Sequence, residues 1–445
     1  MTIIESPPKF ENFMGNVDFF KKIFDIIYKP GLLSLIQKAN DKYYYWTELR
    51  PQVPQNVEIK AEEVWAYLKF GRNANSKRTP IKDKNNQFFT YWIPDSLHRK
   101  ISEVDKWSGG QIITDHPFSL PSRETYIISS LMDEAIASSQ LEGASTEYRV
   151  AKEMLRSGRK PNDKNEQMIF NNWKAMQYIR ENIKTIFSME RICELQSILI
   201  QDTLDRSEES GKLRKNDDIE IRYRDEVVFV PPKADTLEDR MGSLCEFANK
   251  DDEINWIHPV IKGAMIHFWL AYIHPFTDGN GRTARALMYW YLLSRDYKLF
   301  QYLSISKHFI RAPGQYVKAY LYTEHDDNDL TYFLVYNLSS VCFALNELRK
   351  YIKDKQREVS TANQLLSHFR GLNLRQKSLI YHSIQHPDTT YTIESHKNTH
   401  GIAYETARKD LTTLASKGFF KMQREGKKLL LFFSTGKAMD KLQNK

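Results

Sequence analysis

Cysteine is scarce in this sequence, with only Cys193, Cys245 and Cys342 among 445 residues. These three stand far apart and cannot all pair, which excludes a disulfide-stabilised secreted domain. No spacing of Cys and His resembles a zinc site. The N-terminus, MTIIESPPKFENF, lacks a basic start followed by an apolar run, so it does not read as a secretory signal. We therefore expect a reducing, cytoplasmic setting.

Long apolar runs are also missing. The most apolar stretch, GAMIHFWLAYIHPF (263–276), contains two histidines and is too short to span a bilayer, so we expect no membrane partner. What the chain does have is 41% apolar and 13% aromatic residues, a composition that supports packed cores. Its net charge of +8 favours anionic partners such as nucleotides, although only mildly.

Composition and periodicity divide the chain into four segments, in keeping with the two or three domains expected at this length. Residues 1–115 are rich in Tyr and Trp and read as an N-terminal extension of short helices and a hairpin. Residues 116–353 form a predicted helical core that contains a β-hairpin ending at Pro231-Pro232. Residues 354–374 are a predicted linker, and 375–445 a small separate unit. Helices are expected at 121–143, 164–184, 189–203, 235–249, 258–273, 282–296, 314–323 and 330–353.

One short stretch, HPFTDGNGRTAR (274–285), has an unusual composition for a turn between two apolar segments. Its Gly-Asn-Gly turn opens a helix, and the unpaired N–H groups of a helix N-terminus form an anion site. Arg282 and Arg285 are three residues apart and share one face of the first turn. The helix dipole disfavours cations there, so two arginines indicate a polyanion such as a triphosphate between them.

The same stretch contains the groups needed for proton transfer beside a phosphate. Asp278 offers a carboxylate for Mg²⁺, which binds carboxylates together with phosphate oxygens. An imidazole titrates near neutral pH, so His274 can accept a proton. Together these residues predict nucleophilic attack at a phosphoryl centre. The alternative interpretation, a dinucleotide fingerprint in GNGRTA, lacks a βαβ context.

The stretch resembles the Fic motif, H-x-F-x-[DE]-G-N-G-R-x-x-R, at every fixed position. The flanking segments IHPVIKGAMIHFWLAYIHPF and YTEHDDNDLTYFLVYNL look similar to the family too. Fic proteins are mostly adenylyltransferases, which move AMP from ATP to a Ser, Thr or Tyr hydroxyl of a protein. The resemblance implies that His274 is the base and that Asp278 holds Mg²⁺. The nucleotide-binding residues that it implies are Asp278, Gly279, Asn280, Gly281, Arg282, Thr283, Ala284 and Arg285.

Two further elements follow from the resemblance. The hairpin RDEVVFVPP lies just upstream of the motif, where Fic proteins carry a flap that docks an extended target segment. Its candidate docking residues are Val228, Phe229 and Val230, and a hairpin that merely covers core is the alternative. Tyr316 is the candidate for stacking on adenine, with core packing as its alternative role.

A second pattern, SSQLEG (138–143), matches the inhibitory motif S/T-x-x-x-E-G/N of Fic proteins; a solvated helix end is its alternative reading. It implies an inhibitory helix in the same chain, with Ser138, Glu142 and Gly143 at its end. Glu142 would pair with Arg285 and keep the γ-phosphate from its productive orientation. Some family members with this glutamate also remove AMP, so de-AMPylation and transfer of another nucleotide are alternative activities.

The tail, 375–433, contains three predicted helices and a basic hairpin around REGKK, and so resembles a winged helix-turn-helix. Protein contact is the alternative to DNA binding for such a unit. The residues that would meet DNA phosphates are Arg408, Lys409, Arg424, Lys427 and Lys428.

We therefore expect a mainly α protein: a Fic helical core with a small β-hairpin flap, followed by a C-terminal winged helix. The expected function is protein adenylylation that uses ATP and Mg²⁺ and is restrained by Glu142. The expected partner is a protein with a modifiable hydroxyl, and self-modification, homo-oligomers and DNA binding stay open. A nucleotide-sensing DNA-binding regulator is the rival hypothesis, but sensing needs no base such as His274.

Overall fold

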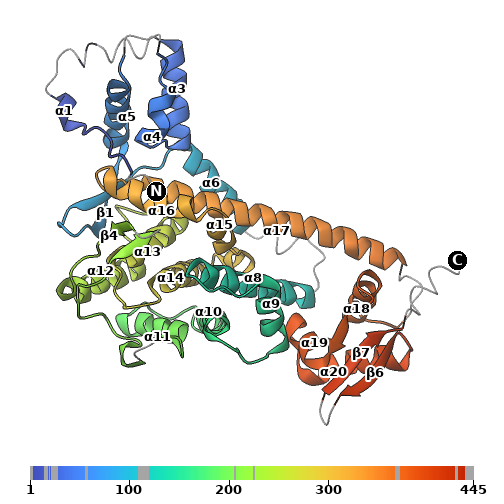
Figure 1. Cartoon of the computed structure of the whole chain (residues 1–445). Helices are drawn as coiled ribbons and strands as arrows, with labels where there is room; N and C mark the ends of the chain where they lie inside the picture. Colours follow the sequence, from blue (N-terminus) through green and yellow to red (C-terminus); the bar gives the residue numbers. More distant parts are fainter. Residues whose placement is uncertain are drawn as a thin grey trace. The chain divides into compact units, whose positions relative to one another are not determined.

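The computed structural model describes residues 4–14, 19, 21, 29–55, 59–108, 120–204, 207–223, 226–365, 371–425 and 429–435. These residues are mainly helical, with small antiparallel sheets of two or three strands, which confirms the predicted fold class (Figure 1). The backbone divides into two compact units. The first comprises Met1–Gly110, Gln177–Lys298 and His308–Cys342, and the second Gln111–Met176, Leu299–Lys307 and Phe343–Lys445. The boundary predicted at 115/116 lies outside the described residues.

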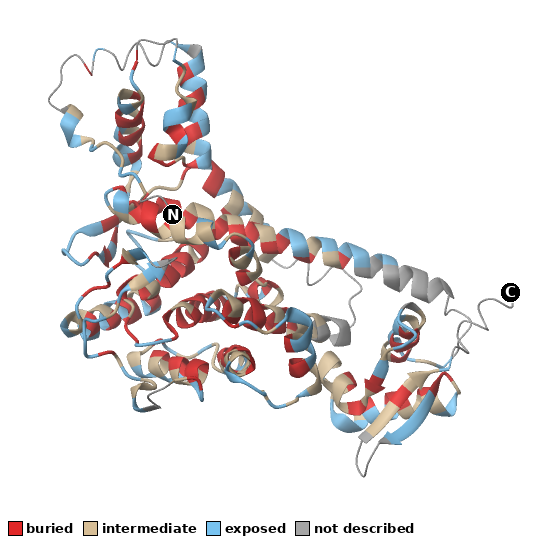
Figure 2. Ribbon diagram, in the orientation of Figure 1, coloured by how far each residue is buried: buried red, intermediate tan, exposed pale blue. Residues whose placement is uncertain are grey.

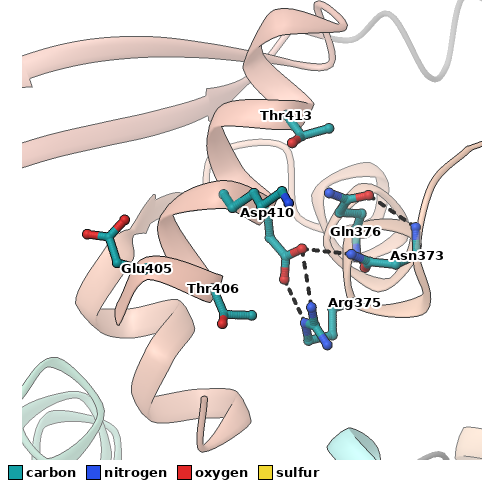
Figure 3. Close-up of a pocket in the computed structure, with 8 residues that line it drawn as sticks. Asn373, Arg375, Gln376, Glu405, Thr406, Asp410 and Thr413 are labelled. Atoms are coloured by element: carbon teal, nitrogen blue, oxygen red, sulfur yellow. Dashed lines mark hydrogen bonds and ion pairs between the residues drawn. The ribbon is translucent and has the colours of Figure 1, made fainter. Parts of the chain in front are cut away.

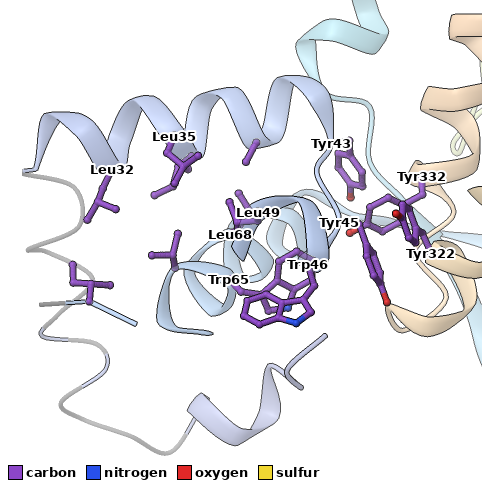
Figure 4. Close-up of a cluster of buried hydrophobic side chains, with 14 residues drawn as sticks. Leu32, Leu35, Tyr43, Tyr45, Trp46, Leu49, Trp65, Leu68, Tyr322 and Tyr332 are labelled. Atoms are coloured by element: carbon purple, nitrogen blue, oxygen red, sulfur yellow. The ribbon is translucent and has the colours of Figure 1, made fainter. Parts of the chain in front are cut away.

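The N-terminal part of the first unit is built around aromatic side chains. Tyr45, Trp46 and Trp65 pack with leucines from three helices, and Tyr322 and Tyr332 from far along the chain complete this core (Figure 4). The rings of Tyr45 and Tyr322 stack with their centroids 3.9 Å apart. The elements here are α1 (Glu11–Met14), α3 (Pro30–Lys42), α4 (Trp46–Leu49), η1 (Arg50–Gln52), α5 (Ala61–Asn75), β1 (Lys77–Lys82), β2 (Phe88–Tyr91) and α6 (Asp95–Lys106).

A buried ion pair fixes this N-terminal part to the rest of the first unit. The Lys69 Nζ lies 3.0 Å from Asp326 Oδ2, and both side chains are almost fully buried. The Tyr332 hydroxyl donates to the same carboxylate at 2.8 Å, so the charge is satisfied from two sides. Removing one partner from such a buried pair typically costs about 3–5 kcal/mol.

The central helices of the first unit are buried on all sides. Nearly all residues of α13 (Pro259–Ile273) and α14 (Asn280–Ser294) are buried, as expected of core helices (Figure 2), and the two helices pack against each other. Gly263 permits this approach, because a Cβ there would lie 3.0 Å from Leu292 Cγ. The other elements are α11 (Met189–Ile200), η3 (Ser207–Glu209), β3 (Ile221–Tyr223), β4 (Glu226–Phe229), η4 (Ala234–Thr236), α12 (Leu237–Asn249) and α16 (Pro313–His325).

The second unit is centred on α8 (Leu120–Leu141) and α9 (Tyr148–Ser157), which share an apolar cluster with Ile169. The Glu134 carboxylate on α8 accepts a hydrogen bond from the backbone N–H of Ser306 at 3.0 Å, and so ties the 299–307 segment to this helix. η5 (Lys298–Tyr302) lies at the start of that segment. Like η5, three α-helices have residues in both units: α10 (Lys164–Glu181), α15 (Ser306–Arg311) and α17 (Thr331–Leu365).

The C-terminal segment, residues 371–435, is a small helical bundle backed by a three-stranded sheet in the order β5-β7-β6. The three helices and the hairpin predicted from the sequence are all present, and β5 adds a third strand. Lys427 and Lys428 lie outside the described residues. The elements are α18 (Leu374–Gln385), β5 (Thr390–Thr392), α19 (Ile393–His400), α20 (Tyr404–Ser416), β6 (Phe420–Glu425) and β7 (Leu429–Ser434).

A buried carboxylate organises the C-terminal segment. Asp410 accepts hydrogen bonds from Arg375 Nε at 2.6 Å and Asn373 Nδ2 at 2.7 Å (Figure 3). It also lies 3.3 Å from His396 Nε2. Burial alone would raise the pKa of Asp410, but the hydrogen bonds from these three residues outweigh it and hold the pKa well below its usual range. A pocket of about 420 Å³ opens beside it, lined by Asn373, Arg375, Gln376, Glu405, Thr406, Lys409, Asp410 and Thr413.

α17 is longer than the sequence predicts. It continues to Leu365, well into the segment 354–374 that reads as a linker. Residues 354–365 contain neither Gly nor Pro, so nothing in the backbone ends the helix once it has begun. Among the described residues, no helix is both long and apolar enough to cross a membrane.

Candidate active site

The motif 274–285 forms the connection between α13 and the first turns of α14. His274 stands directly after α13 with φ 46° and ψ 60°, a left-handed conformation that is uncommon for a residue with a side chain. Its backbone N–H donates to Leu270 O at 3.1 Å, and its side chain is partly exposed. The loop thus turns sharply out of a buried helix and leaves an imidazole within reach of solvent.

Asn280 holds this loop closed. Its side-chain Oδ1 accepts from Phe276 N at 2.9 Å, and its Nδ2 donates to Phe276 O at 2.7 Å. Asn280 and Phe276 are both buried. The sequence assigns Asn280 to the phosphate cradle. Its side chain holds the Phe276 backbone through one acceptor and one donor, and its backbone N–H at the start of α14 is a further group suited to that role.

Gly279 is required by two separate constraints. Its φ of 81° is in the left-handed region, and a Cβ would lie 2.8 Å from Ile200 Cγ2. Asp278 beside it keeps 48% of its side chain exposed while its Oδ1 accepts from Gly279 N at 2.6 Å. Thr283 and Ala284 are buried in the first turn of α14, where the Thr283 hydroxyl donates to Gly279 O at 2.8 Å. Gly281 is partly buried.

Both arginines of the motif are buried, with Arg282 1% and Arg285 3% exposed. Arg282 Nη1 donates to Leu199 O at 2.9 Å, and Nη2 lies 3.4 Å from Asp278 Oδ2. Arg282 Nε is one of the few buried side-chain nitrogens in the described part of the chain that have no hydrogen-bond partner. Two buried cations at the positive end of a helix form a strongly electropositive site.

Tyr316 is part of a hydrogen-bonded chain inside the first unit. Its hydroxyl lies 2.8 Å from His267 Nε2 and 3.1 Å from the Tyr320 hydroxyl, and its ring stacks on Phe309 at 4.6 Å. Burial, and then the positive charge of Arg285, hold the pKa of His267 well below its ordinary value, so this imidazole is neutral. The ring predicted to stack on adenine thus already has one stacking partner in the core.

The hairpin β3–β4 lies in the same unit as the motif. Phe229 is buried, and its ring packs on Tyr272 with centroids 4.9 Å apart. Val230 is 44% exposed, and Val227, which the sequence analysis did not single out, is 43% exposed. Val228 is partly buried. The hairpin therefore combines a core-covering side chain with exposed valines on either side of it.

Two residues that brace the motif were missed by sequence reasoning. Gln196 on α11 donates from Nε2 to Asp278 O at 3.0 Å and accepts from Gly211 N at 2.8 Å. The Arg214 Nε donates to His274 O at 2.9 Å. They lie 82 and 60 residues before their partners in the sequence, and no local pattern marks either of them.

The predicted inhibitory residues lie at the end of α8 in the second unit. Ser138 is buried in the helix. Glu142 comes one residue after its last residue, Leu141, and is exposed. Gly143 follows with φ 96°, and the chain then continues to α9. Glu142 therefore belongs to the connection between α8 and α9.

The Fic/DOC family model matches residues 186–292, which include the whole motif, α11, the hairpin and α13. The chain carries a Fic domain. A protein adenylyltransferase Fic from Nematostella vectensis is 50% identical over 72 residues, which cover 15% of this chain and 16% of that protein. The protein adenylyltransferase fic-1 from Caenorhabditis elegans is 35% identical over 60 residues, covering 14% of this chain and 12% of that protein. The chain thus spans less than a fifth of the length of these curated relatives.

Solved structures of Fic proteins also resemble this chain. A fragment of Fic-1 from C. elegans aligns with 78% of this chain and 96% of its own length, with 16% identity and a TM-score of 0.49. A Fic family protein from Desulfovibrio desulfuricans G20 aligns with 77% of this chain and 95% of its own length, with 17% identity and a TM-score of 0.48.

Proposed function

We propose that this Fic-domain protein is a protein adenylyltransferase that transfers AMP from ATP to a Ser, Thr or Tyr hydroxyl of a target protein. The observation that carries the proposal is the composition of the loop before α14. A partly exposed imidazole and a half-exposed carboxylate lie there beside two buried guanidinium groups at the positive end of a helix. The names of the curated relatives, protein adenylyltransferase Fic, support the same activity.

The proposed reaction needs a base and an aligned triphosphate. His274 accepts the proton of the target hydroxyl, whose oxygen forms a bond to the α-phosphorus of ATP. The bond from that phosphorus to the bridging oxygen of the β-phosphate breaks, and pyrophosphate leaves. Because attack is in line with the leaving group, a displaced phosphate slows transfer even when ATP is bound. The N–H groups that open α14, with Arg282 and Arg285, are our candidates for holding the phosphates.

Mg²⁺ fits the donor set of this loop. Asp278 supplies one solvent-accessible carboxylate, and the described residues contain no group of three or more His, Cys, Asp or Glu side chains that would form a metal cage. Mg²⁺ commonly binds through one carboxylate together with substrate phosphates and waters, which is the arrangement that a lone Asp278 suits. When bound, the ion would neutralise phosphate charge.

We also propose that Glu142 restrains transfer by pairing with Arg285. A carboxylate on that guanidinium would take the place of phosphate charge and would leave the γ-phosphate badly oriented. Shifting an equilibrium from 1:99 to 99:1 takes roughly 5.5 kcal/mol, and a charge-assisted contact to the buried Arg285 guanidinium would favour the restrained state. Removing the glutamate should therefore switch transfer on.

Incorporation of α-labelled ATP tests both proposals. The wild-type, Glu142→Gly and Glu142→Gly/His274→Ala proteins are incubated alone, for self-modification, and with cell lysate. We expect a large rise for Glu142→Gly and background label for the double variant. Equal labelling of wild type and Glu142→Gly would contradict the inhibitory role, and labelling without His274 would contradict the base.

The nucleotide and the direction of the reaction need a separate measurement. Mass spectrometry of the modified protein after incubation with ATP, GTP, CTP or UTP identifies the transferred group, and AMP is the expected one. Incubating the modified protein with the wild-type chain then tests removal of AMP. A loss of label that depends on Glu142 would assign the reverse reaction to the same site.

For the C-terminal segment we propose a winged helix, since its order is helix, strand, two helices and a hairpin. α20 exposes Arg408 and Lys409, and β6 exposes Arg424, which would meet phosphates of duplex DNA. Glu405 on α20 opposes them, lying 3.6 Å from Arg408 Nη1. A mobility shift that weakens steeply with salt would support DNA binding, and no shift at low salt would end it.

A further inference from the structure

Arg214 lies beside the motif, makes several hydrogen bonds to the backbone and has no role in the proposed reaction. Its side chain is only 1% exposed. Its guanidinium donates to three backbone carbonyls: His274 O at 2.9 Å through Nε, Asn216 O at 2.7 Å through Nη1, and Pro232 O through Nη2. Its own backbone N–H donates to Pro275 O at 2.9 Å.

These carbonyls belong to two different parts of the site. His274 and Pro275 begin the motif loop, whereas Pro232 follows the hairpin β3–β4 by a few residues and Asn216 precedes it. One planar cation therefore joins the backbone of the candidate base to both ends of the hairpin. Arginine suits this task because its donors point in fixed, diverging directions, whereas a lysine has one nitrogen.

The backbone that Arg214 holds is a strained one. A side-chain-bearing residue in the left-handed region is energetically disfavoured and persists only where its surroundings enforce it. His274 is fixed on one side by the bond from its N–H to Leu270 O, and on the other by the bond from Arg214 Nε to its carbonyl. We propose that Arg214 is a positioning residue for AMP transfer, which keeps His274 and the hairpin in register with each other.

The test compares Arg214→Lys with Arg240→Lys, both in the Glu142→Gly protein. Arg240 is a matched control, since it is partly buried in the same unit and donates to two backbone carbonyls, Lys82 O at 2.8 Å and Asp83 O at 3.0 Å. Neither of those contacts reaches the motif. Thermal unfolding is measured first, so that activities are compared well below each midpoint.

This inference rests on the proposed adenylyltransferase activity, and kinetics give its functional arm. We expect Arg214→Lys to lower kcat by about 10- to 100-fold, the effect of a displacement near 1 Å, and to raise KM for the target. The Kd for ATP should stay within twofold, because Asn280 closes the motif loop independently. Arg240→Lys should change none of the three. Parental kinetics in Arg214→Lys, or equal losses in both variants, would overturn the proposal.

Hydrogen exchange gives an arm that needs no activity. The backbone amides of 226–230, His274 and Phe276 should exchange faster in Arg214→Lys and at the parental rate in Arg240→Lys. If the Glu142→Gly protein labels no target, the adenylyltransferase proposal fails, whereas the exchange data still decide whether Arg214 holds the loop and hairpin. Unchanged hydrogen exchange at both segments would refute the proposal that Arg214 holds them.

In the second unit, the C-terminal segment contacts the helix that ends beside Glu142. α19 of the C-terminal segment packs against both α8 and α9, the two helices that flank Glu142. Gly401, which ends α19 with φ 61°, lies so close to α8 that a Cβ would be 2.7 Å from Glu124 Cγ and 2.9 Å from Ile128 Cδ1. On the α9 side, Asn398 Nδ2 donates to Arg156 O at 2.8 Å.

This arrangement connects the C-terminal segment to the proposed inhibitory residue within one unit. The contact at Ile128 and the turn at Glu142 are joined by an unbroken stretch of α8, and a helix transmits a displacement along its axis. We infer that the C-terminal segment holds the inhibitory helix in place, so that loosening α19 from α8 raises AMP transfer. The inference rests on the proposed restraint by Glu142.

Gly401→Val tests this coupling because it adds bulk where the side chains of Glu124 and Ile128 leave no room. We expect at least a fivefold rise in label incorporation when Glu142 is present, and no rise in the Glu142→Gly protein. Ile128→Ala, which removes bulk from the α8 side of the contact, should act in the same direction. Simple structural damage would instead lower incorporation in both backgrounds, and that result would refute the coupling.

Hydrogen exchange again separates this inference from the activity. Residues 136–147 should exchange faster in Gly401→Val, while 274–285 in the first unit keep their parental rates. If Glu142→Gly shows no gain in transfer, the inhibitory proposal fails, yet the exchange of 136–147 still reports whether α19 holds α8. Parental exchange rates at 136–147 would overturn the inference that α19 holds α8 in place.

Discussion

The motif loop and the C-terminal segment use the same kinds of side chains in opposite ways. Each contains an aspartate beside an arginine and near a histidine. Asp410 is 3% exposed at its side chain and is bonded by Arg375 and Asn373. Asp278 keeps 48% of its side chain in solvent, and its nearest guanidinium nitrogen is 3.4 Å away.

This difference in exposure separates a carboxylate that stabilises the fold from one that can bind a ligand. A buried carboxylate with all its partners in place is neutralised within the fold, and its removal is felt as lost stability. A half-exposed carboxylate beside two buried arginines contributes little to the fold, and so it is available to a ligand. The comparison predicts that equivalent substitutions will damage activity in the first region and stability in the second.

Asp278→Asn should give the largest effect. The amide keeps the acceptor for Gly279 N but loses the charge proposed to bind Mg²⁺. We expect AMP transfer in the Glu142→Gly protein to fall about 1000-fold, since a metal supplies several kcal/mol of charge stabilisation, while the free energy of unfolding changes by less than about 0.5 kcal/mol. Label incorporation at increasing Mg²⁺ measures AMP transfer, and denaturant unfolding measures the free energy of unfolding. A loss of stability as large as that expected for Asp410→Asn would contradict the difference proposed between the two aspartates.

Asp410→Asn should show the reverse pattern. It leaves Arg375 without a counter-charge inside the C-terminal segment, which we expect to cost about 3 kcal/mol of stability. Denaturant unfolding monitored by hydrogen exchange of 374–434 measures this loss. Glu405→Gln on the same helix is the control, because its side chain is 77% exposed and should cost under about 0.5 kcal/mol. Equal costs for the two variants would show that burial does not distinguish them.

Much of this contrast was predictable for the motif because its twelve residues are contiguous. The turn before a helix, the imidazole at its start and the paired arginines all follow from spacing along the chain. The braces were not predictable, since Gln196 and Arg214 come from 82 and 60 residues away, and only the fold brings them to the loop. Asn280 shows a subtler limit: its amide suits both a phosphate and Phe276, and only geometry decides between them.

Gly279→Ala should have an intermediate effect on both properties. It combines a left-handed φ with a Cβ placed 2.8 Å from Ile200 Cγ2, and we expect about 2 kcal/mol of destabilisation together with at least tenfold slower AMP transfer. Ile200→Ala removes the colliding methyl group, so a double-mutant cycle separates collision from backbone strain. A coupling energy near zero would mean that strain alone explains the cost.

The C-terminal segment should also respond to pH. Burial, and then the neighbouring His396 and Arg375, lower the pKa of His400 to about 3 from its ordinary value of 6.5. Between these values the unfolded chain binds a proton that the folded segment does not, so stability falls as the pH decreases from 6.5 towards 3. A difference of one pKa unit corresponds to about 1.4 kcal/mol.

Asp410 does not interfere over most of this window. Its pKa is depressed below the ordinary value of 3.8, so the stability that it contributes is lost only in more acidic solution. Unfolding free energies measured between pH 7 and 4 should therefore slope downward in the parent and much less in His400→Gln, which has no proton to gain. An unchanged slope in that variant would mean that a group other than His400 causes the acid sensitivity.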